Sequence, residues 1–369
     1  MSIQQSAVDL YYMAQELKNQ LVGAKIDQIY QYEKKTFAIR FHKSGVGKKE
    51  CIIEVPKCLY LTKNRPSAPK KQLAMSAYFR KSIKGMFVED IFQPGFTRVI
   101  CMSLSFKDVK KYVFFEFFDK GNIIVCTQEK DEYVIEMPIE NQKWSDREIR
   151  KGQVYIPEAK TYPHELSLND IGDILRQSTD SVSKVFATVF GLGGMYAEIV
   201  CNWSNIPLQA VYTDDMADSI QSSFASLFSQ KLAPKIVQNK NGTAIKAILP
   251  FSGEQSYTEY SQPFDEYCTP KIGSQKEDAK LKKFQKELQK IESMIKHQEK
   301  TQKKLEKDSV VFTEIGKYVQ THYHKMETYI QKGQKAESLQ DDELSTFLKE
   351  NQILSIDKKA KTVTVAKHE

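Results

Sequence analysis

The sequence has 369 residues, with 54 Lys and Arg against 47 Asp and Glu, and therefore a net charge of +7. Its 27% charged and 41% apolar residues are typical of a folded soluble protein, which excludes a disordered acidic tail, a collagen-like chain and a disulfide-rich miniprotein. At about 150 residues per domain, the length predicts two or three domains. We expect no membrane partner, because no apolar run approaches the roughly 20 residues that cross a bilayer and the N-terminus does not have the pattern of a secretory signal.

Residues 1–157 are predicted to form an α+β domain rich in strands. A helix is expected over residues 3–21, where apolar residues recur every three or four positions, and another over residues 70–83. Residues 43–49 are interpreted as a hairpin loop. The alternation in residues 96–106 predicts that Val99 and Cys101 face one way and Ile100 and Met102 the other. Strands are expected at residues 25–31, 36–42, 50–55, 58–62, 96–106, 110–118, 121–127 and 132–137.

Residues 158–270 are predicted to form a second, mainly helical domain. Helices are expected at residues 168–177, 181–201 and 213–231, a short strand at 242–249, and an irregular polar stretch at 252–270. Gly191, Gly193 and Gly194 interrupt the second helix. Such a turn either offers helix-start N–H groups to a phosphate, as a helix-hairpin-helix does, or only supplies the positive φ that a helix–helix turn needs.

Residues 271–333 are predicted to form a coiled-coil arm. From Leu281 to Leu305 the seam positions follow alternating steps of three and four. Residues 276–307 hold eleven Lys against six acidic residues, so this face is either simply solvated or binds a polyanion. The helix is expected to end at residues 332–333. Residues 334–369 then form a small module, with a helix at 341–350 and strands at 353–356 and 361–366.

The residues point to a binding protein rather than an enzyme. No motif for a nucleophile elbow, a phosphate-binding loop, a dinucleotide site or a helical zinc site is present. The six cysteines form no CxxC pair and lie mostly in apolar strands, which predicts reduced, buried thiols and a cytoplasmic protein. We therefore expect no catalytic residue, metal or cofactor. Arg80, Lys81 and Lys84 at a helix end and Arg98 at a strand start favour nucleic-acid contact, given the net charge.

Blocks of sequence in collinear order resemble the NFACT family over nearly the whole chain. The N-terminal domain of that family is similar to AVDLYYMAQELKNQLVGAKIDQIYQ (residues 7–31), PKCLYLTK (56–63), AMSAYFRKSIKG (74–85) and FFEFFDKGNIIVCT (114–127). Its helix-hairpin-helix domain is similar to FGLGGMYAEIVC (190–201), in an archaeal style, and its middle module to ILSIDKKAKTVTV (353–365). The seam from Leu281 resembles its first coiled-coil arm.

The resemblance implies a fold and a function. The N-terminal domain should be similar in fold to that of formamidopyrimidine-DNA glycosylases, although residues 1–3 lack the proline and glutamate of glycosylase chemistry. The family acts in ribosome-associated quality control. It implies a non-enzymatic factor that binds the large ribosomal subunit and its rRNA together with peptidyl-tRNA, and that recruits tRNA for template-free C-terminal tailing.

The resemblance also implies the RNA-facing residues. Thr97 and Arg98 stand where the family commonly has an Asp-Arg pair tied to tRNA engagement; Arg98 keeps the cationic fork, whereas Thr97 cannot hold it as a carboxylate would. Further tRNA contacts are expected from Arg80, Lys81, Lys84, Lys120, Asn122, Gly191, Gly193 and Gly194. Lysines of the arm should face rRNA, namely Lys282, Lys283, Lys286 and Lys290.

Other interpretations stay open. Typical members continue into a second coiled-coil arm and a C-terminal RNA-binding domain, so we expect either a truncated chain or a natural short paralogue, both with an unpaired seam. A DNA-binding, repair-like protein would prefer damaged or duplex DNA. A scaffold that binds only protein would instead form a homo-oligomer through the seam at residues 281–305.

Overall fold

The computed structural model describes residues 3–67, 73–145, 147–239, 242, 245–253, 257–272, 274–336, 338–357 and 359–366; for residues 274–283, 285, 286, 341 and 342 it describes the backbone alone. The chain divides into two compact units, unit 1 (Met1–Asp278) and unit 2 (Ala279–Glu369). The finer domain boundaries at residues 157, 270 and 333 stay predictions.

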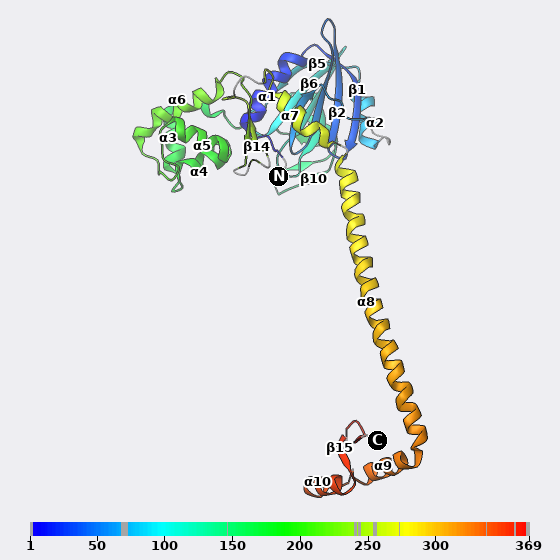
Figure 1. The fold of residues 1–369 in the computed structure, drawn as a ribbon. Coiled ribbons are helices and arrows are strands. Elements are labelled where there is room, and N and C mark those ends of the chain that lie inside the picture. Colours follow the sequence, from blue (N-terminus) through cyan, green and yellow to red (C-terminus); the bar gives the residue numbers. More distant parts are fainter. Residues whose placement is uncertain are drawn as a thin grey trace. The chain divides into compact units, whose positions relative to one another are not determined.

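Unit 1 is built on one large antiparallel sheet, so the α+β prediction is confirmed (Figure 1). Its strand order among the described residues is β12-β9-β8-β7-β6-β5-β1-β2-β3-β4. The strands are β1 (Lys25–Glu33), β2 (Thr36–Lys43), β3 (Gly47–Glu54), β4 (Cys58–Thr62), β5 (Phe87–Phe92), β6 (Val99–Phe106), β7 (Val109–Glu116), β8 (Asn122–Glu129), β9 (Glu132–Pro138) and β12 (Val154–Tyr155).

The sheet buries both of its faces around β6, and the predicted alternation there is confirmed. Ile100 and Met102 belong to the larger core, whereas Val99 and Cys101 belong to a second, smaller core. Helix α1 (Ala7–Leu21) packs on β5 and β6. It begins at Ser6, whose side chain and that of Asp9 form a reciprocal capping box. The predicted helix is present, but it begins at Ala7 rather than at residue 3, because the capping box at Ser6 fixes its start.

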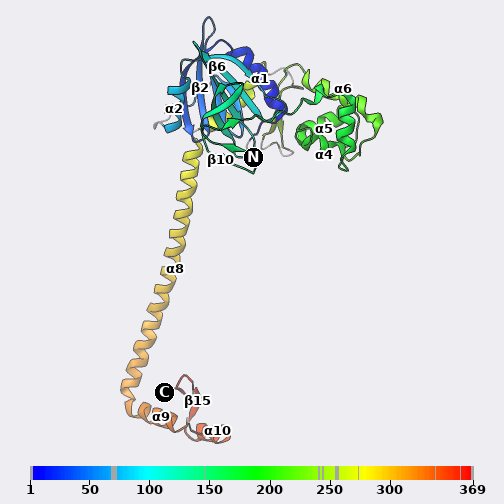
Figure 2. The same ribbon diagram turned by 180° about the vertical axis from the view of Figure 1, so that it is seen from behind.

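A helical group stands beside the sheet. It comprises α3 (Leu168–Arg176), α4 (Val182–Thr188), α5 (Gly194–Trp203) and α6 (Ala217–Phe228), and α4, α5 and α6 lie together in both views (Figures 1 and 2). Phe186, Phe190 and Phe224 form its aromatic centre. The shorter α2 (Ala74–Ile83) packs on β1 instead.

Several elements of unit 1 correct the sequence predictions. The stretch 252–270 was expected to be irregular, but it holds α7 (Ser261–Cys268), which packs on β4 through buried Phe264. Strand β5 was not predicted, and β3 begins inside the expected hairpin loop. Short strands were also missed: β10 (Gln142–Lys143), β11 (Glu148–Ile149), β12 and β13 (Lys235–Gln238), the last of which pairs with β14 (Ile245–Leu249).

Unit 2 consists of helices and one hairpin: α8 (Ser274–Thr321) from Ala279 onward, α9 (Tyr323–Ala336), α10 (Asp341–Glu350), β15 (Ile353–Asp357) and β16 (Thr362–Val365). The long helix breaks at His322, and α9 continues past the expected end at residues 332–333, because Gly333 lets it pack directly against Val363 of β16. Among the described residues, no helix combines the length and the apolar character that a bilayer crossing requires.

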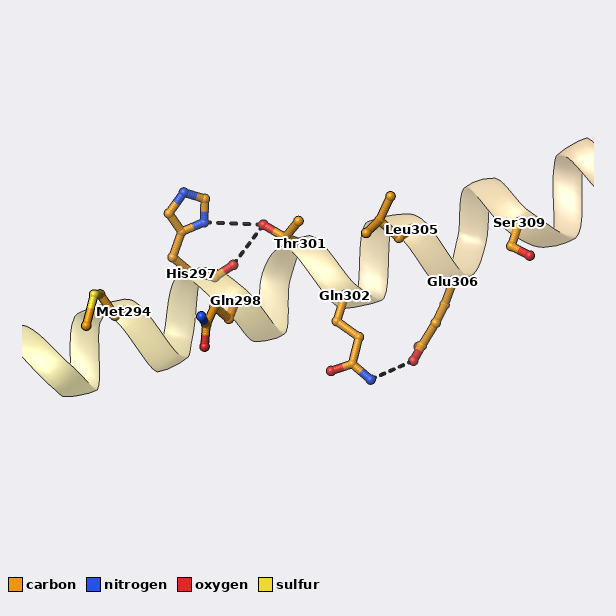
Figure 3. A pocket seen from close by; sticks show the side chains of 8 residues that line it. All are labelled: Met294, His297, Gln298, Thr301, Gln302, Leu305, Glu306 and Ser309. Atoms are coloured by element: carbon orange, nitrogen blue, oxygen red, sulfur yellow. Dashed lines mark hydrogen bonds between the residues drawn. The ribbon is translucent and has the colours of Figure 1, made fainter.

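The seam of α8 is exposed. Leu288, Ile291 and Leu305 keep 58%, 51% and 62% of their surface accessible. Figure 3 shows a shallow hollow between Met294 and Ser309 whose lining side chains all come from α8 itself. A hollow on one helix has no opposite wall, so it is part of the same open face rather than an enclosed ligand site.

Candidate nucleic-acid interface

Arg98 is held in one orientation just before β6. Its Nε donates to the carbonyl of Gln5 at 3.1 Å and its Nη2 donates to the carbonyl of Pro56 at 3.4 Å. A guanidinium has five N–H donors, and Nη1 has no partner among the described residues. Burial lowers the pKa of Arg98, and the negative charge of Asp9 opposes that shift; the group stays a cation at neutral pH.

Thr97 does not share this position. Its side chain is buried, and its hydroxyl donates to the carbonyl of Pro94 at 3.5 Å. Gln93 in turn donates to the Thr97 carbonyl at 2.5 Å. The structure therefore gives Thr97 a role in the turn that precedes β6, and its expected contact with RNA stays a prediction.

Asp9 is a buried carboxylate whose charge acts on Arg98, and the sequence analysis missed it. Its Oδ1 accepts the hydroxyl of Tyr196 and, at 2.7 Å, that of Tyr260. Its Oδ2 accepts the amide and the hydroxyl of Ser6 at 2.7 and 2.8 Å. Burial raises the pKa of Asp9, and the hydrogen bonds from the two tyrosines and Ser6 counter the rise. A local signal for Asp9 is only that of a helix cap, since both tyrosines lie far along the chain.

The glycine turn (residues 190–194) joins α4 to α5 next to this cluster. Gly191 and Gly193 have φ of +75° and +78°, a region that favours glycine. The amides of Leu192 and Gly193 donate back to α4, at 3.1 Å each, and close that helix. Gly193 then serves as N-cap of α5 without any side-chain hydrogen bond, so the first N–H groups of α5 have no side-chain acceptor.

The structure brings the glycine turn and Arg98 to the same region. A Cβ on Gly191 would lie 3.9 Å from the ring of Phe96, two residues before Arg98. Tyr196, in the first turn of α5, donates to Asp9, whose charge acts on Arg98. Phe190 and Leu192 are buried, Gly191 and Gly193 are half-buried, and Gly194 is exposed. The turn is therefore anchored by its apolar residues and open at its glycines.

Some of the other predicted residues are exposed, and others are bonded within the fold. Lys81 and Lys84 are exposed on α2, whereas the Nε of Arg80 donates to the Ile29 carbonyl at 2.8 Å. Lys120 is exposed at the tip of the β7–β8 connection. Asn122 is fully buried. Its side-chain Nδ2 donates to the Glu140 carbonyl, and its Oδ1 accepts the backbone N–H of Glu140. These bonds support the fold at this position, and the expected contact of Asn122 with RNA stays a prediction.

The arm lysines are only partly described. Lys290 is exposed on α8. The side chains of Lys282, Lys283 and Lys286 lie outside the described residues. All six cysteines are free thiols, and five of them are buried, as predicted.

These features define an α+β protein in which a helical group packs beside a large antiparallel sheet, and a long helical arm follows. The chain belongs to the NFACT family: the model for the NFACT N-terminal and middle domains matches residues 6–357.

Relatives and solved structures agree with this assignment. The archaeal Rqc2 homolog aRqcH of Methanocaldococcus jannaschii is 24% identical over 327 residues, which cover 82% of this chain and 48% of that protein. The ribosome quality control complex subunit 2 of Saccharomyces cerevisiae is 26% identical over 152 residues, 41% of this chain and 14% of that protein. The chain thus spans half or less of these relatives.

The fold resembles that of the N-terminal part of a fibronectin/fibrinogen-binding protein from Streptococcus suis, with a TM-score of 0.58 and 22% identity. The alignment covers 71% of this chain and 98% of that structure. The similarity supports the fold described above.

Proposed function

We propose that the chain is a non-enzymatic RNA-binding factor of ribosome-associated quality control, which binds the large ribosomal subunit with its peptidyl-tRNA and recruits tRNA for C-terminal tailing. The observation that carries the proposal is the placement of Arg98 beside the glycine turn. The names of the archaeal and yeast relatives, both quality-control proteins of the ribosome, support the cellular process.

The geometry suits a sugar-phosphate backbone. The anchored fork of Arg98 leaves Nη1 for a phosphate oxygen, and the uncapped start of α5 offers backbone N–H groups to a second one. Thr97, which stands where the family commonly has a carboxylate, is buried, and the buried carboxylate of Asp9 adds a negative charge that acts on Arg98. Of the four arm lysines expected to face rRNA, Lys290 is described and exposed.

A tRNA-binding titration of the full chain tests the proposal. At about five phosphate contacts, log affinity should fall against log salt with a slope of roughly −3.5 to −4.5. Arg98→Gln should weaken binding about tenfold and reduce the slope by about 1. Arg150→Gln, which removes an exposed arginine paired only with Glu148, should change affinity less than about twofold.

A second variant separates binding from folding. A side chain at Gly194 meets nothing within 4 Å and needs no positive φ, so Gly194→Glu places a carboxylate at the start of α5 without steric conflict. An acidic residue there favours the helix but repels phosphate. We expect intact stability with weaker tRNA binding. Absence of tRNA binding by the natural chain at about 50 mM salt contradicts the proposal, and preference for, or nicking of, an abasic duplex favours the DNA-repair interpretation.

A further inference from the structure

Two thiols from distant parts of unit 1 are in contact, where β4 meets α7. Cys58 is buried at the start of β4, and Cys268 is half-buried at the end of α7. Each thiol acts on the pKa of the other, which places the two side chains close together. Both are free cysteines, so the pair is a reduced dithiol rather than a structural disulfide.

The contact is part of a continuous packing row. Cys58, Tyr60 and Thr62 alternate along β4 and so share one face of the strand. The Tyr60 ring stacks on Phe264 with centroids 6.0 Å apart, and its hydroxyl lies 3.1 Å from that of Thr269. Thr62 donates to Asp265. Because the neighbours of Cys58 along the row are fixed on α7 and the turn that follows it, Cys58 and Cys268 are held together by the fold.

The two sulfurs differ in their surroundings. The neighbouring Cys58 lowers the pKa of Cys268; burial and the charge of Glu54 oppose this shift, and the charges of Lys271 and Lys57 support it. The neighbouring Cys268, together with burial, raises the pKa of Cys58. Cys268 thus has the accessibility and the thiolate character of a sulfur that reacts with oxidants, whereas Cys58 has a protected thiol next to it.

We propose that Cys58 and Cys268 form a reversible disulfide when the protein meets a peroxide, with Cys268 as the attacking sulfur and Cys58 as the resolving one. The Cys268 thiolate attacks a peroxide oxygen, the O–O bond breaks, and hydroxide leaves, giving a sulfenic acid on Cys268. Cys58 loses its proton and attacks that sulfur; the S–O bond breaks, and the departing hydroxide takes up the proton as water. Two thiols and one hydrogen peroxide give one disulfide and two waters.

The disulfide would fasten α7 to β4. Its cysteines enclose most of unit 1, and a cross-link across so long a loop restricts the unfolded chain strongly. The inference does not depend on the proposed RNA-binding function.

The chain carries its own matched control. Cys101 and Cys126 are close enough to influence one another electrostatically, but both are fully buried in the smaller core. Burial raises the pKa of both thiols, that of Cys126 to about 12. The same peroxide should therefore leave this second pair reduced in the folded protein.

Peptide mapping of the full chain after hydrogen peroxide treatment tests the proposal. We expect one cross-linked peptide pair joining Cys58 to Cys268, 2 Da lighter than the reduced pair (the two hydrogens lost) and restored by dithiothreitol. The oxidised chain should melt about 5 °C or more above the reduced one. Cys58→Ser should stop at a sulfenic acid on Cys268 that dimedone traps, and Cys268→Ser should leave Cys58 reduced.

The unsubstituted chain decides the matter even if a serine variant folds poorly. The proposal fails if Cys58 and Cys268 stay reduced under peroxide conditions that oxidise glutathione. It fails equally if the Cys101–Cys126 pair oxidises first, or if Cys268 is found only in disulfides between chains.

Discussion

Replacing Tyr196 by phenylalanine should lower the free energy of unfolding of unit 1 by about 1.5–3 kcal/mol, the range for a hydrogen bond to a charged group. The Tyr196 hydroxyl is fully buried and donates to Oδ1 of Asp9, so water does not replace the lost bond. Tyr260 cannot compensate, because its single proton also has the Ile248 carbonyl at 2.7 Å as an acceptor.

Tyr12→Phe is the matched control for this substitution. The Tyr12 hydroxyl is also buried and also joins α1 to the helical group, through the Leu227 carbonyl at 2.6 Å. Because that acceptor is neutral, its loss should cost about 0.5–1.5 kcal/mol. Urea unfolding at pH 7, followed by far-UV circular dichroism and the fluorescence of Trp203, measures both. A Tyr196→Phe loss no larger than that of Tyr12→Phe contradicts the assignment of Asp9 as a buried carboxylate that needs its donors.

The same comparison has a pH dependence. The hydrogen bond from Tyr196 favours the ionised form of Asp9, against the burial that raises its pKa. As pH falls through the folded-state pKa of Asp9, the carboxyl becomes neutral and its bond to Tyr196 weakens. The Tyr196→Phe loss should then fall toward that of Tyr12→Phe. A loss that stays constant from pH 7 down to the pH where the chain unfolds refutes this reasoning.

Three further results are expected. Burial raises the pKa of Glu16 as it does that of Asp9. The stability that these carboxyls contribute is therefore complete below the unfolded-state pKa of about 4 and is lost as pH rises through their folded-state pKa values. Urea titrations at a series of pH values should show a flatter pH profile for Glu16→Gln. Leu288→Asp combined with Ile291→Asp should abolish any self-association seen by sedimentation, with the circular dichroism of unit 1 retained, and oligomers that persist exclude the seam as their interface. Asn122→Ala should cost about 1–3 kcal/mol and leave the tRNA affinity of the folded protein unchanged; a pure affinity loss would restore Asn122 as an RNA contact.

Local periodicity was sufficient to predict the elements that obey one pattern over their whole length. Helix α1 has its capping serine and its apolar stripe in sequence, and β6 has strict alternation between two cores. Strand β5 was missed because a bulge between Val88 and Asp90 shifts its register and spaces its buried residues three apart. A search for strictly alternating buried and exposed residues fails at such a bulge.

Helix α7 was missed for a different reason. It contains Pro263 and few aliphatic residues, so propensity does not favour it. Its support is tertiary: Glu16 of α1 accepts the amides of Tyr260 and Ser261 at its start, and Asp265 accepts bonds from β4. These partners lie about 200 residues or more away along the chain, beyond the reach of any local pattern.

The candidate site likewise contains residues that a local pattern predicts and residues that only distant contacts explain. Arg98 and the glycine turn could be predicted because each belongs to a short motif. Asp9 could not, since its tyrosine donors are 187 and 251 residues away, and in sequence it is only an acidic residue in a first helical turn. Asn122 is the opposite case. It is a polar residue in a sequence block that resembles the family, which suggests a surface contact, and its burial is known only from the structure.

Net charge is a poor guide to where this protein would bind a polyanion, since a lone flexible cation on a surface contributes little. Arg98 differs because the carbonyls of Gln5 and Pro56 already restrict its side chain, so less conformational entropy remains to be lost on binding. Asp9, whose charge acts on Arg98, is itself fixed by Tyr196, which follows the glycine turn. The arginine is therefore held by two backbone carbonyls and the helix start by the Tyr196–Asp9 bond, so substitutions at Tyr196 should loosen the helix start while the carbonyl bonds of Arg98 are retained.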